Sequence, residues 1–189
     1  MKKRLTIAVL ALLLSANFIY SQQKNVVKKE SAISVNGTST LHDWDMLVEE
    51  YSSKANFSIE ENSITISKSN FSFKTEDMKS SSSGMNSKAY EALLTKKHPT
   101  INFQQNGDVK TTLSGNKFNA SVSGILTIAG SSKNVILKTT GEILTDGTIK
   151  IQGKLTDKMS LYGVTPPKAM MGAIKSGDDI TINFNVTYK

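Results

Sequence analysis

The stretch from Phe118 to Ile128, FNASVSGILTI, alternates between apolar and polar residues more regularly than any other part of the chain. Its even positions hold Phe, Ala, Val, Gly, Leu and Ile, whereas its odd positions are mostly polar. Successive side chains of a β-strand point to opposite faces, so a period of two predicts a strand with one dry and one wet face. Strands of this kind are typical of antiparallel sheets that cover a core on one side only.

The same alternation continues on both sides of this stretch, with turn signals between the runs. Dipeptides such as Asn106-Gly107, Gly115-Asn116 and Asp146-Gly147 favour tight hairpins, because glycine and asparagine accept the positive φ angles that these turns need. The apolar positions of the neighbouring predicted strands are Ile101 and Phe103, Val109 and Leu113, Val135 and Leu137, Ile149 and Ile151, and Ile180, Ile182, Phe184, Val186 and Tyr188.

The N-terminal half of the chain shows the same period with one interruption. Residues 32–41 predict a strand that Gly37 interrupts, and alternating residues around Trp44 and Phe57 predict two more on either side of a polar turn at 49–54. Ile64 and Ile66 then differ in parity from Phe71 and Phe73, so a straight strand would point these pairs to opposite faces. We therefore expect a β-bulge at 68–70 that restores the register.

One segment, Met85 to Phe103, departs from the period of two and predicts a short helix over residues 87–97. Tyr90, Leu93 and Leu94 lie three and four positions apart, so they share one face of a helix. Asn86 is the expected N-cap, and His98-Pro99 ends the helix because proline restricts the preceding residue to extended angles. The apolar face of this helix must pack against the sheet.

The pattern as a whole predicts an all-β fold, an extended antiparallel barrel of about eight strands with one short helix. Closure into a barrel removes the unpaired strand edges that a sheet of this size would otherwise expose. A sandwich of two sheets is the alternative. Residues 158–177 do not alternate and are rich in Met, Pro and Gly, so we expect them to form a loop over one end of the barrel.

The chain of 189 residues is long enough for one well-buried core, which predicts a single domain. Residues 1–21 resemble a secretory signal peptide: three basic residues precede an apolar run, and the small Ser21 marks a cleavage point. Residues 22–31 are polar and predict a flexible leader, so residues 32–189 form the folded domain. We therefore expect a periplasmic or secreted protein without a membrane span in its mature chain.

Composition excludes several classes of function. Removal of residues 1–21 takes away three of the 23 basic residues and lowers the formal net charge from +7 to +4, and the lysines are scattered with few aromatic residues between them. This distribution argues against nucleic-acid binding. The chain contains no cysteine, so disulfides, thiol chemistry and thiolate metal sites are excluded.

No residue pattern supports catalysis, so we expect a protein that is not an enzyme and needs no metal or cofactor. Adjacent strand residues such as His42 and Asp43 point to opposite faces, so they do not share one substrate atom. The pairs Glu49-Glu50 and Asp178-Asp179 diverge for the same reason. The serines at 80–83 lack the strand-turn-helix setting of a nucleophile. The two histidines, His42 and His98, are expected to have structural roles.

Five segments in order resemble the YceI-like family. They are GTSTLHDW at 37–44, the segment from Met85 to Phe103, GILTIAGSSKNV at 124–135, SLYGVTPP at 160–167 and GDDITINFNV at 177–186. Asn86 stands where the family pattern has Asp. The resemblance implies an exported, lipocalin-like barrel that binds a polyisoprenoid lipid in its apolar interior, such as the tail of an isoprenoid quinone. It covers almost all of the mature chain.

A ligand-binding interior agrees with the residues expected to face inward. Small residues at 55, 120, 124 and 153 alternate with large ones and would make room for a ligand in a barrel of eight strands. The alternative is a filled core, in an interaction module whose loops bind protein or polysaccharide. Pairing of two chains remains open. The expected ligand-binding residues are Trp44, Phe57, Phe71, Phe73, Leu93, Ile101, Phe103, Leu126, Ile128, Leu161, Tyr162, Met170 and Phe184.

Overall fold

The computed structural model describes residues 21–189, so the predicted signal segment lies outside the described residues except for Ser21. One α-helix, α1 (Ser83–Ala92), accompanies the strands, together with four short 3₁₀ turns. The strands are β1 (Gln22–Asn25), β2 (Ala32–Ser39), β3 (Trp44–Val48), β4 (Ser52–Glu60), β5 (Ser63–Lys74), β6 (Met78–Lys79), β7 (Thr100–Gln105), β8 (Val109–Thr112), β9 (Lys117–Ile128), β10 (Ser131–Ile143), β11 (Ile149–Lys158), β12 (Lys168–Ala169) and β13 (Ile174–Tyr188).

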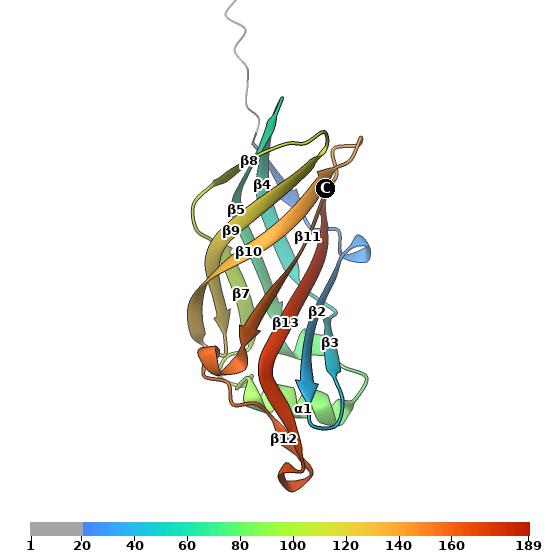
Figure 1. The fold of residues 1–189 in the computed structure, drawn as a ribbon, viewed down its shortest axis with the longest axis vertical. Helices are drawn as coiled ribbons and strands as arrows, with labels where there is room; N and C mark the ends of the chain where they lie inside the picture. Colours follow the sequence, from blue (N-terminus) through green and yellow to red (C-terminus); the bar gives the residue numbers. More distant parts are fainter. Residues whose placement is uncertain (1–20) are drawn as a thin grey trace, which may run out of the picture.

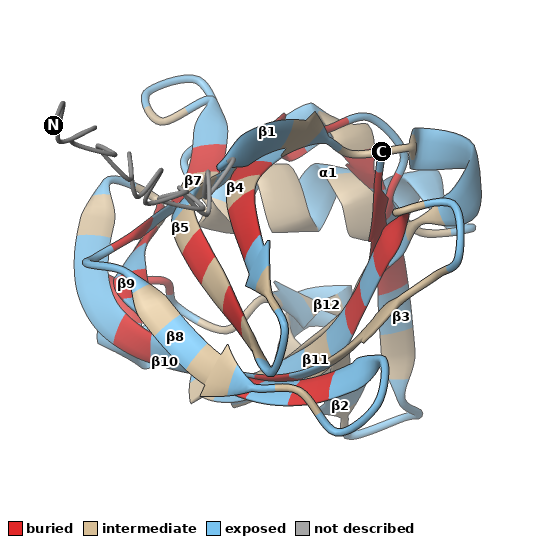
Figure 2. Cartoon of the chain, turned by 90° about the horizontal axis from the view of Figure 1, so that it is seen from above, coloured by how far each residue is buried: buried red, intermediate tan, exposed pale blue. Residues whose placement is uncertain are grey.

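All strands belong to one antiparallel sheet that curls into an elongated half-barrel (Figures 1 and 2). The strand order is β1-β4-β5-β7-β9-β10-β11-β13-β2-β3-β6, and β8 and β12 pair with β5 and β13. The predicted all-β fold with a single short helix is therefore confirmed, and the sheet does not form a sandwich of two layers. The strand number exceeds the predicted eight chiefly because β1, β6, β8 and β12 have only two to four residues each.

Backbone bonds join the chain after the edge strand β1 to the C-terminal end of β13. Asn25 and Lys189 exchange two backbone hydrogen bonds of 3.2 and 3.1 Å, and Val27 donates to the carbonyl of Thr187 at 2.7 Å. The segment from β1 onward thus lies between β4 and β13. The predicted flexible leader at 22–31 is wrong to this extent, because its first residues form a strand. Strand β1 pairs with β4, which is distant in the sequence, so a local sequence pattern does not predict this strand.

Alternation along the strands places the core inside the sheet, as the sequence predicts. Every even position of β9 from Phe118 to Ile128 is buried, whereas the odd positions are exposed or half-buried. The predicted bulge in β5 is also confirmed. Lys54 pairs with Asn70 but Asn56 pairs with Ser67, so β5 holds one extra residue at Lys68–Ser69, and Lys68 takes a positive φ of 52°.

The turn at Asn106-Gly107 does not make the hairpin that its sequence predicts. Strands β7 and β8 both pair with β5, one after the other along the same edge. The Gln105 side chain explains this path, because its amide donates to the carbonyls of Ile66 and Gly107 at 2.8 and 2.7 Å and accepts from the Ser69 backbone. The chain therefore bends outward at Gly107 and returns to β5.

The helix begins earlier and ends earlier than the predicted range 87–97. Ser82 is the N-cap, since its hydroxyl accepts from the backbone N–H of Met85 at 3.3 Å. The predicted cap, Asn86, instead accepts from the backbone and hydroxyl of Ser80. A positive φ of 52° at Leu94 ends the helix before the proline does. Among residues 21–189, no helix is long and apolar enough to cross a membrane.

The helix and the segment 159–173 both lie at one end of the curled sheet, opposite the end where β1 and the C-terminus meet (Figure 1). The segment holds two 3₁₀ turns and the short strand β12, so the predicted loop over one end has some regular structure. This arrangement places α1 and the segment 159–173 around one end of the inside of the sheet.

Candidate functional site

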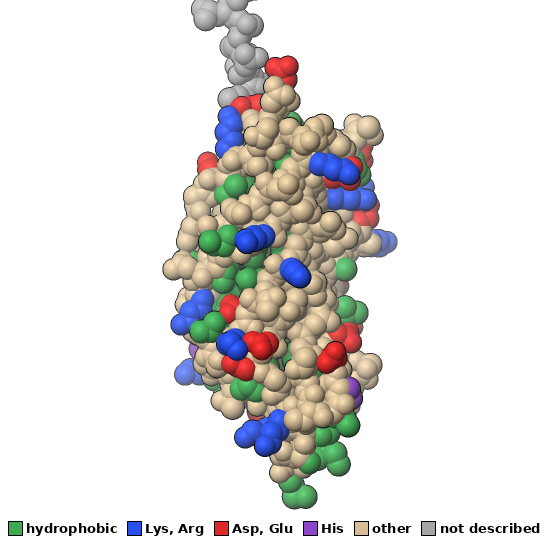
Figure 3. Space-filling view, viewed as in Figure 1, with side chains coloured by type: hydrophobic (Ala, Val, Ile, Leu, Met, Phe, Trp, Pro, Cys, Tyr) green, Lys and Arg blue, Asp and Glu red, His purple; other side chains and the backbone are tan. Residues whose placement is uncertain are grey.

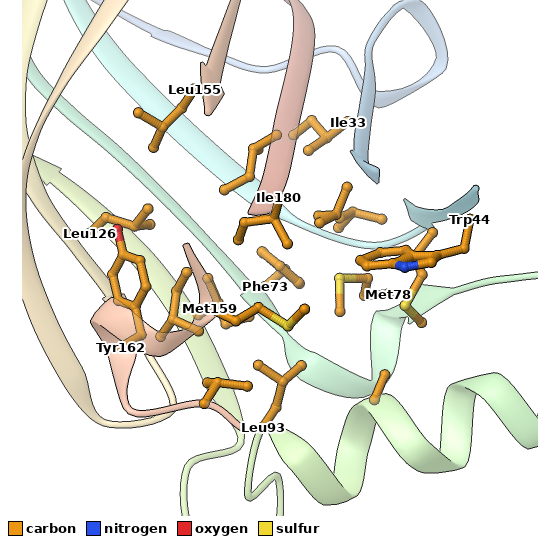
Figure 4. A pocket seen from close by; sticks show the side chains of 18 of the residues that line it. Ile33, Trp44, Phe73, Met78, Leu93, Leu126, Leu155, Met159, Tyr162 and Ile180 are labelled. Atoms are coloured by element: carbon orange, nitrogen blue, oxygen red, sulfur yellow. The ribbon is translucent and has the colours of Figure 1, made fainter. Parts of the chain in front are cut away.

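The inside of the curled sheet contains an elongated apolar cavity of about 720 Å³. Its wall combines side chains from β2, β3, β5, β7, β9, β11 and β13 with the inner face of α1 (Figure 4). Among the described residues, no Asp or Glu lines it, and its cationic side chains are those of Lys88 and Lys168. A volume of this size lies within the range of about 300–1,000 Å³ that is typical of small-molecule sites.

Strand β13 contributes a row to this wall that is interrupted at Asp178. Ile174, Ser176, Ile180, Ile182, Phe184, Val186 and Tyr188 all line the cavity. They keep to one face of the strand because a register shift between Ser176 and Ile180 changes its pairing with β2 without changing the parity of the row. At roughly 3.3 Å per residue, the row extends about 45 Å along the strand. The cavity therefore suits a long, narrow ligand.

The two ends of the interior differ. Towards the chain termini, Phe57, Ile64, Phe118 and Ile149 are buried and do not line the cavity, so they fill that end. At the other end, exposed residues of the β2–β3 turn, of α1 and of the β12 segment line it, among them Leu41, Lys88 and Met170. The cavity thus opens towards solvent between these three segments.

Aromatic rings of the wall lie over glycines on neighbouring strands. A Cβ atom at Gly37 would approach the Trp44 ring to 2.3 Å, and at Gly153 it would approach the Phe184 ring to 2.6 Å. Both pairs face each other across a strand pair. The expectation that small residues make room for a ligand directly is therefore wrong at Gly153, and also at Gly124, where a Cβ would approach the Phe103 ring to 2.4 Å. They make room for rings, which lie flat along the wall and leave the middle of the interior open.

Polar side chains in the wall are paired with protein groups. Trp44 Nε1 donates to the carbonyl of Thr38 at 2.9 Å and to the Ser176 hydroxyl at 3.1 Å. Tyr162, which is only 2% exposed, donates its hydroxyl to the Asp157 carboxylate at 2.7 Å. Burial and this hydrogen bond raise the pKa of Tyr162 well above the ordinary range of a phenol.

The deep end of the cavity is closed by a hydroxyl pair. The Ser53 and Tyr188 hydroxyls lie 2.7 Å apart, and Ser53 also donates to the carbonyl of Asn70 at 2.9 Å. Burial raises the pKa of Tyr188, so its phenol stays protonated at neutral pH. These groups satisfy one another and present mainly the carbon faces of their side chains to the cavity.

The structure brings most of the predicted ligand-binding residues to the cavity. Phe57 and Leu161 do not line it: Phe57 packs against the Tyr188 ring with centroids 5.4 Å apart, and Leu161 is 50% exposed beside the wall. Both departures concern local geometry that alternation does not specify. The predicted residues that do line the cavity are Trp44, Phe71, Phe73, Leu93, Ile101, Phe103, Leu126, Ile128, Tyr162, Met170 and Phe184.

Several residues that line the cavity were not predicted from the sequence, and three of them lie on α1. Met85, Ala89 and Ala92 face the cavity together with Leu93. The predicted apolar face included Tyr90 and Leu94 instead. Tyr90 donates its hydroxyl to the carbonyls of Glu76 and Met78, and Leu94 is 53% exposed. The spacing of Met85, Ala89 and Ala92 at i, i+4 and i+7 was the signal that would have identified this face.

Reactive side chains are not brought together by the fold. Within residues 21–189, no group of three or more His, Asp or Glu side chains is arranged to hold a metal ion. His42 lies at the cavity opening with Nδ1 2.6 Å from the carbonyl of Asp43. His98 lies against the turn at Gly130, where a Cβ would approach the imidazole to 2.4 Å. The lining of this cavity suits an apolar molecule.

A family model described as the YceI-like domain matches residues 22–188, which is nearly the whole described chain. The chain belongs to the YceI-like family. This membership agrees with the segment-by-segment resemblance seen in the sequence. No curated protein is detectably similar in sequence to this YceI-like protein.

Solved structures with the same fold share little sequence with this YceI-like protein. Burkholderia cenocepacia BcnA has a TM-score of 0.69 at 19% identity, over 86% of this chain and 98% of its own. A polyisoprenoid binding domain from Saccharophagus degradans, implicated in plant cell wall breakdown, has a TM-score of 0.66 at 12% identity, over 90% and 99%. The Campylobacter jejuni YceI protein has a TM-score of 0.56 at 20% identity, over 74% and 81%. At these identities the likeness shows a shared fold.

Proposed function

We propose that this YceI-like protein is an exported lipid-binding protein that holds the hydrocarbon tail of a polyisoprenoid or isoprenoid quinone in its cavity. The observation that carries the proposal is the elongated apolar cavity of about 720 Å³, open at one end. A relative of the same fold is named a polyisoprenoid binding domain, which supports the ligand class. The role is sequestration, transport or storage, without catalysis or a cofactor.

Burial of a prenyl chain supplies enough free energy for binding. At roughly 0.8 kcal/mol per buried CH₂, each five-carbon unit gains on the order of 3 kcal/mol before ordering costs. Three or four units gain about 9–12 kcal/mol against an association cost of about 4–15 kcal/mol, so each further buried unit tightens binding without any polar contact. The alternative function, an interaction module with a filled core, would require side chains to occupy the space of the cavity, so the cavity argues against it.

The distribution of polar groups favours one orientation of the ligand. At the deep end, the Ser53 and Tyr188 hydroxyls are already paired with each other, so this end suits the apolar tail. At the open end, Lys88 and Lys168 line the cavity and are exposed to solvent. We therefore place the polar headgroup at the opening, where it keeps contact with water.

Trp44 offers a direct test, because it is the only tryptophan in the chain and lines the cavity. Titration with a short-chain prenyl quinone should quench its fluorescence in a saturable manner. The variant Ala89→Phe, which adds a ring to the inner face of α1, should weaken binding at least tenfold. Ser87→Phe places the same ring on the exposed face of the helix and should bind as the unsubstituted protein does.

The proposal fails if a folded, delipidated protein shows no saturable quenching with prenyl quinone. It also fails if Ala89→Phe and Ser87→Phe bind equally well, because the ligand would then occupy another surface. A matched titration with a water-soluble quinone that lacks the tail separates insertion of the chain from collisional quenching of an accessible ring.

A further inference from the structure

The open end of the cavity carries apolar side chains that no part of the described chain covers. Met171 is fully exposed at 108%, Met170 is 73% exposed and Leu41 is 65% exposed. Figure 3 shows hydrophobic side chains at the tip of the molecule where Figure 1 places β12, with basic side chains beside them. Two of the three residues, Leu41 and Met170, also line the cavity, so the exposed apolar surface is continuous with its interior.

The backbone holds these methionines outward. Met170, Met171 and Gly172 have positive φ angles of 48°, 54° and 91°. Residues other than glycine adopt this left-handed backbone conformation at an energetic cost, and here burial of the two methionine side chains does not offset that cost. The tight turn that results makes a narrow, convex tip.

The tip is fixed to the neighbouring β2–β3 turn. Thr40 donates its backbone N–H to the carbonyl of Lys175 at 3.0 Å, and the Lys175 backbone donates to the Thr40 hydroxyl at 3.1 Å. Thr40 also donates its hydroxyl to the carbonyl of Ala173 at 3.3 Å. Leu41 and the two methionines therefore belong to one ordered surface, which we call the rim: Leu41, Lys168, Met170, Met171 and Lys175.

Cationic groups flank the apolar residues of the rim. Lys168 and Lys175 are paired across β12 and β13 and are both exposed. Neither forms an ion pair with any described carboxylate, and residues 164–176 contain no Asp or Glu. Farther along β13, Asp178 accepts from Ser160 and Asp179 pairs with Lys158. The β2–β3 turn carries the exposed Asp43, and Glu91 on α1 pairs with Lys88.

We propose that the rim docks the open end of the cavity onto a lipid bilayer that contains anionic lipids. The apolar tip enters the boundary between headgroups and acyl chains, and Lys168 and Lys175 lie against the lipid phosphates. A convex tip of three apolar side chains suits insertion, whereas stable protein interfaces are broad and bury more than about 1,000 Å². Docking of this kind would let a prenyl chain move between the bilayer and the cavity without crossing water, and this consequence rests on the proposed lipid-binding function.

Vesicle flotation tests the proposal with the purified protein. We expect the protein to float with vesicles of phosphatidylcholine and phosphatidylglycerol and to be released by high salt, which screens lysine–phosphate attraction. Met171→Ser should weaken binding at least fivefold. Lys175→Glu changes the net charge by two units. At about fivefold per charge, it should weaken binding to the vesicles about 25-fold. Neither residue lines the cavity, so both variants should take up prenyl quinone from solution normally.

The control variant is Ile136→Ser with Lys138→Glu, which replaces an exposed apolar residue and a lysine on the outer face of β10 and should leave flotation unchanged. Equal flotation with phosphatidylcholine alone, or no flotation, would overturn docking while quinone uptake from solution would still support the lipid-binding function. Absence of uptake from solution would count against that function itself. A change in oligomeric mass on Met171→Ser would also overturn docking, because the rim would then cover a second copy.

Discussion

At the scale of single residues, glycines determine where the aromatic rings of the wall lie. Gly37, Gly124 and Gly153 each face a ring of the wall, and at least one ring carbon would lie within 2.6 Å of an added Cβ. The period of two predicts that the rings of Trp44 and Phe184 face inward, but it does not predict that they lie flat. That property depends on which residue faces each ring on the next strand, and so on a register that one sequence does not specify.

Gly37→Ala should displace the Trp44 ring, because the ring lies across the position of the new methyl group. Trp44 would lose its hydrogen bonds to Thr38 and Ser176, and overpacking costs about 1–3 kcal/mol of unfolding free energy. Urea unfolding and a red shift of tryptophan emission measure both effects. Gly84→Ala is the matched control, since its Cβ would meet no atom closer than 3.8 Å. Equal stability of the two variants would contradict this account.

Tyr162 should make stability depend on alkaline pH. Burial and the hydrogen bond to Asp157 raise its pKa in the folded state above the unfolded value of about 10. The folded protein therefore retains this proton more strongly, so the contribution to stability is fully present below about pH 10 and is lost as the pH rises further. Unfolding free energies at about pH 8 and pH 11 should fall less in Tyr162→Phe than in the unsubstituted protein. Equal losses would show that Tyr162 is not involved.

At the scale of elements, α1 forms one side of the opening and has limited support of its own. None of its residues is fully buried, and it is held by the Ser82 cap, by the Tyr90 hydroxyl and by the packing of Met85, Ala89 and Ala92 over the cavity. A helix with these few contacts opens at lower free energy than the long strands do. It is therefore the element that we expect to move when a ligand enters.

Ser82→Ala removes the cap of α1 and should cost about 1 kcal/mol of helix stability. Amide hydrogens in α1 should then exchange about fivefold faster, while those of β9 and β10 stay unchanged. Ser81→Ala, at an exposed position before the cap, serves as the control. Unchanged exchange in Ser82→Ala would show that the cap does not limit opening of the helix.

The boundaries of elements were the part of the fold that the sequence predicted least well. The parity change between Ile66 and Phe71 correctly predicted a bulge, because a mismatch of faces has few other solutions. The start of the helix was missed because Asn86 was the expected cap, and which serine caps the helix depends on the path of the preceding chain. Strand β1 was missed for a similar reason, since its polar residues pair with distant β4.

At the scale of the whole molecule, alternation and turn signals were sufficient to predict the curled antiparallel sheet. They were also sufficient to predict that its inside is apolar. Whether that inside is filled or hollow depends on ring orientation and on the helix across one end, and neither follows from periodicity. The cavity, its opening and the rim are therefore features that only the three-dimensional arrangement shows.

The central claim is that the hollow interior holds a prenyl lipid. Native mass spectrometry of the protein purified from its own host without detergent tests this claim most directly. The account predicts a bound, dissociable species whose mass corresponds to a lipid with a chain of five-carbon units. A bare protein mass, together with no uptake after incubation with prenyl quinone, would contradict it.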